Sequence, residues 1–245
     1  MIIGSKRIFL EKVTSTNTLL DQLLAAESLA EGTIIQAGYQ TAGKGQKANT
    51  WESEEGKNLI FSILLYPSFI LPSNQFLISM AVSLGILDYV SRHTDRCTIK
   101  WPNDIYVNND KIAGILIENS LMGNEIKNTI AGIGLNLNQV RFYQAPNPVS
   151  LKMLTGIDYD TESSLDQLLS RLDRRYKQLI KVDFLNIRDE YTKHLFRYNE
   201  WFQYSDNNGL FKGRIKSVSE EGRLQIERSG GNINEYSFGD IDFIL

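Results

Sequence analysis

The stretch TIKWPNDIYVNNDKIAGILIEN, residues 98–119, contains short β-prone runs joined by a polar turn. Residues 105–107 and 112–117 favour strands, and the Asn-Asn-Asp sequence at 108–110 between them is typical of a hairpin turn. Pro102 cannot donate a hydrogen bond to a strand ladder, so we expect the chain to kink there or to lie at an edge. The stretch therefore predicts a hairpin with an interruption just before it.

A hairpin alone does not require the charged and amide side chains of this stretch. Lys100, Asn103 and Asp104 surround Pro102, and the hairpin is expected to return Lys111 towards the same end. Two ammonium groups, an amide and a carboxylate gathered in this way suit an anionic, phosphate-bearing ligand. For each residue by itself, a solvated hairpin with scattered charges is the alternative, and it is the combination that favours a site.

Composition describes an ordinary globular protein. The chain has 245 residues, 42% hydrophobic and 22% charged, which fits one large domain or a main domain with a small satellite. A net charge of -3 does not favour a nucleic-acid or anionic-membrane partner. Cys97 is the only cysteine, which excludes an intrachain disulfide and, with two histidines, argues against a zinc site. Without a signal-peptide pattern or a bilayer-length apolar run, a cytoplasmic location is expected.

Apolar periodicity predicts a mixture of strands and helices up to about Tyr198. The expected strands are 7–10, 33–37, 59–65 and 126–137, and the expected helices are 74–92, 163–182 and 184–196. Beyond Trp201, short β patterns alternate with Asn-Gly, Glu-Gly and Gly-Gly turns, which predicts a small β-barrel-like module. The expected domains are therefore 1–198 and 199–245.

Small polar residues precede the first helical pattern. Ser15, Thr16 and Asn17 come just before leucines at helical spacing, so any of them is suited to cap the helix. Capping is the simpler interpretation. The alternative is that these side chains contact a polar group of a ligand at the start of the helix.

A glycine-containing loop, residues 40–51, carries a second candidate site. Two glycines flank Lys44, which allows backbone amides to point inward around an anion. Lys44 and Lys47 add positive charge, and Trp51 offers a flat face for a nucleobase. The spacing matches neither the P-loop nor the Rossmann motif, and the pattern alone is equally typical of a plain surface loop.

Alternating glycines interrupt the apolar run at 126–137. Gly132 and Gly134 mark a place where another group approaches the strand backbone closely. Asn136 follows them, and its paired donor and acceptor suit an amide-like or adenine edge. A turn asparagine before the loop containing Pro146 is the alternative.

These motifs together resemble those of the biotin protein ligases. The matching series is Ser15-Thr16-Asn17, the loop 40–51, Lys100-Trp101-Pro102-Asn103-Asp104, Lys111-Ile112-Ala113-Gly114 and Gly132-Ile133-Gly134-Leu135-Asn136, in that order along nearly the whole chain. The resemblance implies an α+β fold. Its main domain would be a mixed sheet flanked by helices, like that of class II aminoacyl-tRNA synthetases, followed by a small C-terminal SH3-like β-barrel.

The resemblance also implies a two-step reaction that uses biotin, ATP and Mg²⁺. The carboxylate of biotin attacks the α-phosphorus of ATP, giving biotinyl-5′-AMP and pyrophosphate. A lysine of a biotin carboxyl carrier domain, part of a biotin-dependent carboxylase, then takes the biotinyl group and releases AMP. Such chemistry needs positioning and charge neutralisation rather than an enzyme nucleophile.

By resemblance, particular residues take particular roles. The catalytic residues would be Lys44 and Lys111. The biotin-binding set would be Ser15, Thr16, Asn17, Gln40, Gly43, Lys44, Gln46, Lys111 and Gly114. The ATP-binding set would be Lys44, Trp51, Lys100, Asn103, Asp104 and Asn136. Asp104 would either bind Mg²⁺ or orient Lys100, and both roles stay open.

The loop departs from the family pattern at positions that include Lys44, Gln46 and Ala48. The family often has GRGRxGRxW, where this chain has GKGQKANTW at 43–51. Lys44 keeps a charge without the bidentate guanidinium, Gln46 stands where an arginine is common, and Ala48 where a glycine is common. Because Gln46 cannot neutralise charge, we hypothesise that the protein retains the adenylate less tightly.

Competing interpretations come from two classes. A lipoate–protein ligase shares the fold and the acyl-adenylate chemistry, and a non-enzymatic regulator that binds biotin or a nucleotide is the second alternative. Many bacterial biotin ligases carry an N-terminal helix-turn-helix, but here the motifs begin by Ser15, so a repressor role is not expected. Exposed strand edges in this fold allow a homodimer.

Overall fold

The computed structural model describes residues 1–46 and 49–244. Lys47 and Ala48, which the sequence singled out in the glycine-containing loop, lie outside the described residues. The strands of the main sheet are β1 (Arg7–Val13), β2 (Ile34–Gln40), β3 (Leu59–Leu65), β4 (Cys97–Lys100), β5 (Asp104–Val107), β6 (Asp110–Met122) and β7 (Glu125–Leu135). The helices are α1 (Thr16–Ala26), α2 (Phe76–Val90), α3 (Leu151–Thr155), α4 (Thr161–Ile180) and α5 (Phe184–Lys193), and a 3₁₀ turn spans Pro72–Asn74.

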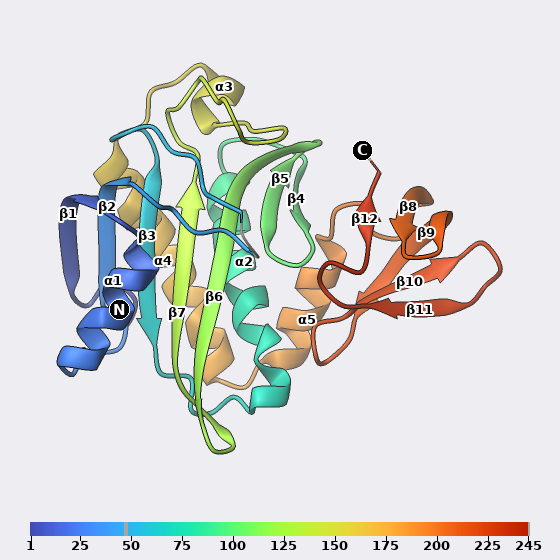
Figure 1. Ribbon diagram of the computed structural model, residues 1–245, viewed down its shortest axis with the longest axis horizontal. Coiled ribbons are helices and arrows are strands. Elements are labelled where there is room, and N and C mark those ends of the chain that lie inside the picture. Colours follow the sequence, from blue (N-terminus) through green and yellow to red (C-terminus); the bar gives the residue numbers. More distant parts are fainter. Residues whose placement is uncertain (47–48, 245) are drawn as a thin grey trace.

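The main sheet is mixed and has seven strands in the order β1-β2-β3-β7-β6-β5-β4. Only the β1–β2 pair in it is parallel, and the other neighbours are antiparallel. Figure 1 shows α1 in front of the sheet, with α2 and α4 behind it. The predicted mixed sheet flanked by helices is therefore confirmed.

Strand β3 explains how the sheet separates core from site. Every residue of β3 is buried. Because side chains alternate along a strand, Leu59, Phe61, Ile63 and Leu65 join the large hydrophobic cluster that includes α2. The alternate positions face α1, where Leu64 belongs to a second, smaller hydrophobic cluster. One face of the sheet therefore builds the core, which leaves the other face free for polar groups.

Helix α2 is apolar all round because it lies between the sheet and α4. Only Phe76 and Asp88 of its fifteen residues are not buried. The Asp88 carboxylate accepts hydrogen bonds from Arg175 Nε at 2.7 Å and from Arg174 at 2.6 Å. These guanidinium groups hold the pKa of Asp88 below its ordinary value against the opposing effect of burial. Asp88 is the charged residue of α2, and its hydrogen bonds with the two arginines hold α4 against α2.

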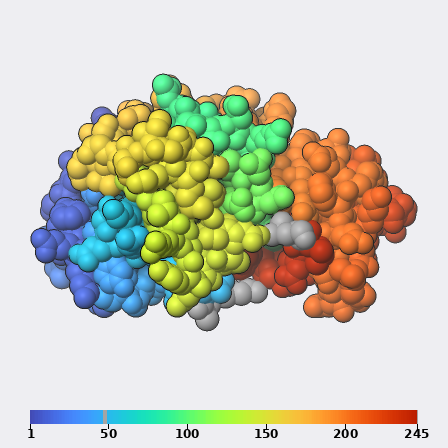
Figure 2. Space-filling view, turned by 90° about the horizontal axis from the view of Figure 1, so that it is seen from above, coloured from blue at the N-terminus to red at the C-terminus, as the bar shows by residue number. Residues whose placement is uncertain are grey.

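A second sheet follows α5. Its strands are β8 (Phe202–Asp206), β9 (Gly209–Val218), β10 (Leu224–Arg228), β11 (Ile233–Tyr236) and β12 (Asp242–Phe243), in the order β11-β10-β9-β8-β12. All of its pairings are antiparallel, which confirms the small C-terminal β module. Figure 2 shows it as an orange and red lobe beside the green segment. The domain boundary expected near Tyr198 stays a prediction.

The β9–β10 turn of this module packs against the main domain. Trp101 Nε1 donates a hydrogen bond to the carbonyl oxygen of Gly222 at 2.9 Å. Gly222 has a φ of +88°, and a Cβ there would lie 2.5 Å from the ring of Phe76. The turn therefore needs glycine both for its backbone conformation and for its contact with α2.

The predicted hairpin is confirmed. Strands β5 and β6 form it, and β4 pairs with β5 across a second turn that contains Pro102. Strand β6 is longer than predicted because it continues to Met122 and pairs with β7 along that length. The short helix α3 was not predicted. Among the described helices, none combines the length and the apolar character that crossing a membrane would require.

Replacing Gly222 by alanine tests the packing of the turn. A left-handed residue that gains a Cβ loses about 1–2 kcal/mol of stability, and Gly222→Ala should lose about 1–3 kcal/mol more because the methyl group overlaps Phe76. The measurement is the free energy of unfolding in urea. Gly231→Ala is the matched control, because Gly231 has a φ of +86° with no atom near its Cβ position. Equal losses in the two variants would show that the Phe76 contact contributes nothing.

Candidate active site

A pocket of about 440 Å³ opens on the face of the main sheet that α1 covers only in part. The start of α1, the glycine-containing loop, the β4–β5 turn, strands β6 and β7 and the C-terminal segment 238–243 all contribute to it. It contains every residue predicted for the site except Gly43 and Asn136. Segments far apart in the sequence therefore meet here as the motifs required.

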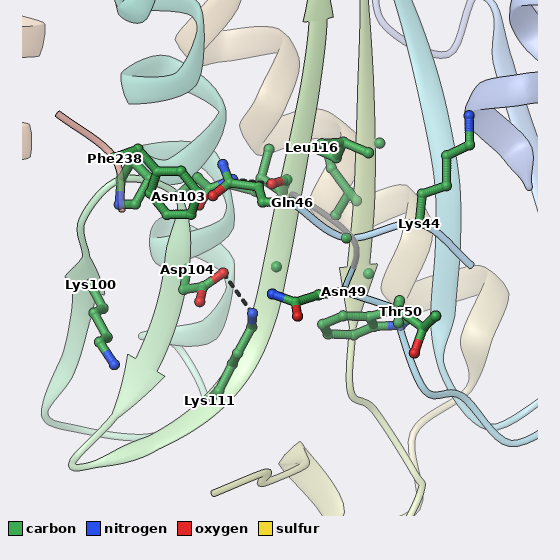
Figure 3. Close-up of a pocket in the computed structure, with 18 of the residues that line it drawn as sticks. Lys44, Gln46, Asn49, Thr50, Lys100, Asn103, Asp104, Lys111, Leu116 and Phe238 are labelled. Atoms are coloured by element: carbon green, nitrogen blue, oxygen red, sulfur yellow. Dashed lines mark hydrogen bonds and ion pairs between the residues drawn. The ribbon is translucent and has the colours of Figure 1, made fainter. Parts of the chain in front are cut away.

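The hairpin gathers its charges at one side of the pocket. Asp104 Oδ1 and Lys111 Nζ form an ion pair of 2.7 Å, and the register places Asp104 opposite Lys100. Figure 3 shows Lys100, Asp104 and Lys111 on one side, with Lys44 on the other and its side chain directed away from them. The predicted cluster is confirmed as an arrangement, and its role in binding stays a prediction.

Lys100 sits among aromatic rings. Its ammonium donates a hydrogen bond to the Tyr106 hydroxyl at 3.2 Å and lies 5.3 Å from the ring centroid of Phe243. Burial lowers the pKa of Lys100, and the neighbouring Lys111 lowers it further, while Asp104 raises it. Asp242 also raises this pKa, but burial and the neighbouring cations outweigh the two carboxylates, so an incoming anion would stabilise the charged form of Lys100.

Gly134 of β7 and Gly114 of β6 leave room for the Trp51 side chain. A Cβ on Gly134 would lie 2.3 Å from the Trp51 ring, and one on Gly114 would lie 3.0 Å from it. The Lys111 ammonium lies 5.7 Å from the centroid of the same ring. The indole Nε1 of Trp51 is buried and has no hydrogen-bond partner within the described part of the chain. The Trp51 ring thus packs on the two glycines, and its indole N–H is available to donate a hydrogen bond.

The residues at the start of α1 do not act as the capping interpretation predicted. Ser15 occupies the N-cap position, but its side chain makes no capping hydrogen bond. Instead the backbone N–H of Thr16 donates to Gln40 Oε1 at 2.7 Å. Ser15, Thr16 and Asn17 are all buried and line the pocket. The capping interpretation is therefore wrong, because no side chain there caps the helix and Gln40 accepts from its first amide.

Asn103 and Asn136 are both buried beside the hairpin but differ in their relation to the pocket. Asn103 lines it, and its amide donates to the carbonyl of Ile115. Asn136 donates from Nδ2 to the Val149 carbonyl at 3.0 Å and is not among the lining residues. Its Oδ1 is buried without a partner in the described residues. The role predicted for Asn136 in ATP binding stays a prediction, and its observed contact holds the chain after β7.

The glycine-containing loop folds back on itself across the pocket. Lys44 and Thr50 form an isolated antiparallel bridge, and the Trp51 N–H donates to the Gly43 carbonyl at 3.0 Å. A Cβ on Gly43 would lie 2.8 Å from the Trp51 carbonyl oxygen, so glycine is needed for this fold of the loop. Lys44 and Gln46 line the pocket, whereas Gly43 shapes the loop behind them.

Sequence reasoning missed two groups of residues. Ser62 of β3 and Glu118 of β6 make hydrogen bonds with the buried residues of α1, and the segment 238–243 closes one end of the pocket. Ser62 lies within a strand whose pattern is otherwise apolar, and Glu118 directly follows the apolar run 112–117, so a polar side chain at these points was the available signal. The segment 238–243 carries no motif, and its place in the site follows only from the fold.

The arrangement suits a ligand with different ends. Buried hydroxyl and amide groups at the start of α1 form one region, and Lys100, Lys111 and Asp104 surround another. A pocket of this kind can bind a polar head group at one region and an anionic, phosphate-bearing group at the other.

Comparison with known proteins agrees with this geometry. The family model of the biotin/lipoate A/B protein ligases matches residues 9–136. The bifunctional ligase/repressor BirA of Bacillus spizizenii is 30% identical over 96% of this chain and 74% of its own length. The biotin–[acetyl-CoA-carboxylase] ligase of Paracoccus denitrificans is 29% identical over 91% of this chain and 94% of its own length.

Solved structures give the same result. The biotin protein ligase of Aquifex aeolicus, in complex with biotin and ATP, superimposes with a TM-score of 0.81 at 26% identity and covers 98% of this chain and 99% of its own. The family model spans the hairpin, the glycine-containing loop and the paired glycines of β7 that build the pocket. This chain belongs to the biotin/lipoate A/B protein ligase family.

Proposed function

We propose that this protein is a biotin–protein ligase that activates biotin as biotinyl-5′-AMP and transfers it to a lysine of a biotin carboxyl carrier domain. The observation that carries the proposal is one pocket in which buried hydroxyl and amide groups and a lysine cluster lie together. The relatives named as biotin ligases and the Aquifex aeolicus complex with biotin and ATP support this choice of substrates.

In the first step the carboxylate of biotin attacks the α-phosphorus of ATP. Two anions must approach each other, so the protein has to neutralise charge and hold the reacting atoms in line. We assign Lys111 and Lys44 to the reacting carboxylate and α-phosphate, and Lys100 to the polyphosphate. Ser15, Thr16, Asn17 and Gln40 take the ureido head group of biotin in this assignment, and Trp51 packs beside the nucleotide.

Asp104 suits either of the two roles open to it. As a single carboxylate, it can supply one oxygen ligand to Mg²⁺, and the phosphates of ATP would supply others, as is usual for this ion. Bound there, Mg²⁺ would neutralise charge on the phosphates. The other role is to orient Lys100. In the structure Asp104 forms its ion pair with Lys111, and it acts on Lys100 through its charge.

In the second step the amine of a carrier lysine attacks the acyl carbon of biotinyl-AMP, and AMP leaves. The amine reaches the mixed anhydride through the open side of the pocket. We assign the carrier to a biotin-dependent carboxylase, which agrees with the name of the Paracoccus denitrificans relative. Homodimer formation, the absence of a nucleic-acid partner and a cytoplasmic location stay predictions.

The first test is mass spectrometry of a biotin carrier domain incubated with the protein, biotin, ATP and Mg²⁺. The expected result is a gain of one biotin that requires ATP, and replacement of biotin by lipoate should give no gain. Lys111→Ala should abolish the gain because it removes a charge next to the reacting phosphate. Lys127→Ala is the control, since Lys127 is exposed on β7 away from the pocket. Biotin-dependent pyrophosphate release distinguishes a wrong carrier from an inactive protein, which would favour the regulator.

The lowered pKa of Lys100 gives a second prediction. In the free enzyme Lys100 should lose its proton below the ordinary lysine value of 10.5, so kcat/KM for ATP should fall on the alkaline side from below that pH. Lys100→Arg stays charged at these pH values and should remove the fall. Lys127→Arg should keep the wild-type profile. An unchanged alkaline limb in Lys100→Arg would show that another group is responsible.

The departure at Gln46 gives a third prediction. Gln46→Arg should slow the loss of biotinyl-AMP from gel-filtered enzyme by roughly tenfold, because a hydrogen bond to a charged group contributes about 1.5–3 kcal/mol. Gln167→Arg adds the same charge on the exposed face of α4 and should have no effect. Equal retention in the wild type and Gln46→Arg would contradict the hypothesis that Gln46 loosens the intermediate.

A further inference from the structure

A chain of hydrogen bonds runs from Glu118 of β6 to the start of α1. Asn17 Nδ2 donates to Glu118 Oε2 at 2.6 Å, and Asn17 Oδ1 accepts from Ser62 Oγ at 2.5 Å. Ser62 Oγ also lies 2.7 Å from Thr16 Oγ1, which in turn lies 3.0 Å from Gln40 Oε1. Thr16, Asn17 and Ser62 are buried, whereas Glu118 is exposed.

The orientation of the Asn17 amide follows from its partners. Two acceptors face Asn17 Nδ2: the Glu118 carboxylate, and the Leu116 carbonyl at 3.5 Å. Neither a carboxylate nor a backbone carbonyl can donate a hydrogen bond. The amino group of Asn17 must therefore face them, and its oxygen must face Ser62. Gly132 makes room for this placement, because a Cβ there would lie 2.3 Å from Asn17 Oδ1.

The hydroxyl protons then have one favourable order. Three oxygen–oxygen contacts, at 2.5, 2.7 and 3.0 Å, share the two hydroxyl protons of Ser62 and Thr16. Asn17 Oδ1 cannot donate, so Ser62 must donate to it. The Thr16 proton can go to Ser62 or to Gln40, and the contact with Ser62 is the shorter of the two. Thr16 therefore donates to Ser62, and its contact with Gln40 is left without a proton. Gln40 Oε1 still accepts from the Thr16 backbone N–H at 2.7 Å.

We propose that Glu118 and Ser62 are positioning residues that turn the Thr16 hydroxyl into a hydrogen-bond acceptor towards the ligand. Thr16 Oγ1 and Gln40 Oε1 then form a pair of acceptors 3.0 Å apart. Because no proton lies between these two oxygens, they repel each other. A ligand N–H group that donates to both of them would relieve the repulsion. This part of the pocket selects a ligand with N–H donors in its head group, such as the cyclic urea of biotin, over one that offers only acceptors or apolar atoms.

The inference rests on the proposed function for the identity of the ligand, and biotin affinity measured by calorimetry tests it without turnover. Glu118→Gln keeps an acceptor and should bind biotin within about threefold of the wild type. Glu118→Lys offers only donors, so the Asn17 amide should turn, the proton order should reverse, and Thr16 should donate to Gln40. Biotin affinity should then fall roughly tenfold or more, as expected when a buried group loses its partner. The KM for ATP and kcat should stay within about twofold.

Two further variants separate positioning from a general effect on structure or charge. Glu125→Lys makes the same change of charge at an exposed position on β7 and should leave biotin affinity unchanged. Thr16→Val removes the hydroxyl that Glu118 is inferred to act through. In that background Glu118→Lys should cause no further loss, because both changes act on one interaction.

The outcomes distinguish this inference from the proposed function. Additive losses in the double variant, or equal affinity in Glu118→Lys and wild type, would overturn the proton order even if the wild type is an active ligase. Wild-type protein that binds biotin with the expected pattern among variants, but forms no biotinyl-AMP, would overturn the proposed function and leave the proton order supported. Wild-type protein that binds no biotin would overturn both.

Discussion

Close approach to the backbone of β7 is the constraint on which the site depends. Gly132 receives the Asn17 side chain and Gly134 receives the Trp51 ring, each at a distance that a Cβ would block. The same strand presents Ala131, Ile133 and Leu135 to the core on its other face. One strand thus stabilises the fold on one side and is kept bare on the other, so the glycines lower local stability in order to create a binding surface.

The lysines of the hairpin give the pocket positive charge that nearby carboxylates only partly neutralise. Within the described residues, Asp104 is the carboxylate that forms an ion pair with a lysine of the hairpin, and its partner is Lys111 rather than Lys100. Lys100 is left against aromatic rings, where burial lowers its pKa. An anionic ligand therefore gains more here than at a solvated surface, because Lys100 is partly buried and its charge is only partly offset by Asp104 and Asp242.

Much of this could be predicted from the sequence because the signals are local. Strand β3 was predicted with the bounds the structure shows, and the hairpin of residues 98–119 was predicted from its turn and its proline. The ion pair of Asp104 and Lys111 follows from hairpin geometry. The contribution of segment 238–243 could not be predicted, since it depends on how the C-terminal module packs against the main domain, where Phe238 lies against Trp101. That packing is a tertiary contact without a sequence motif.

The start of α1 shows why a local rule failed at the site. A serine before a helix normally accepts a hydrogen bond from one of the free amides, and capping contributes about 1 kcal/mol. Here Gln40, from the end of β2, accepts from the first amide of the helix instead. The side chains at the helix start are then oriented by contacts from other strands, chiefly Ser62 and Glu118. The polar side chains of this helix start are therefore not used for capping, and the buried hydroxyls that line the pocket are held by contacts with other strands.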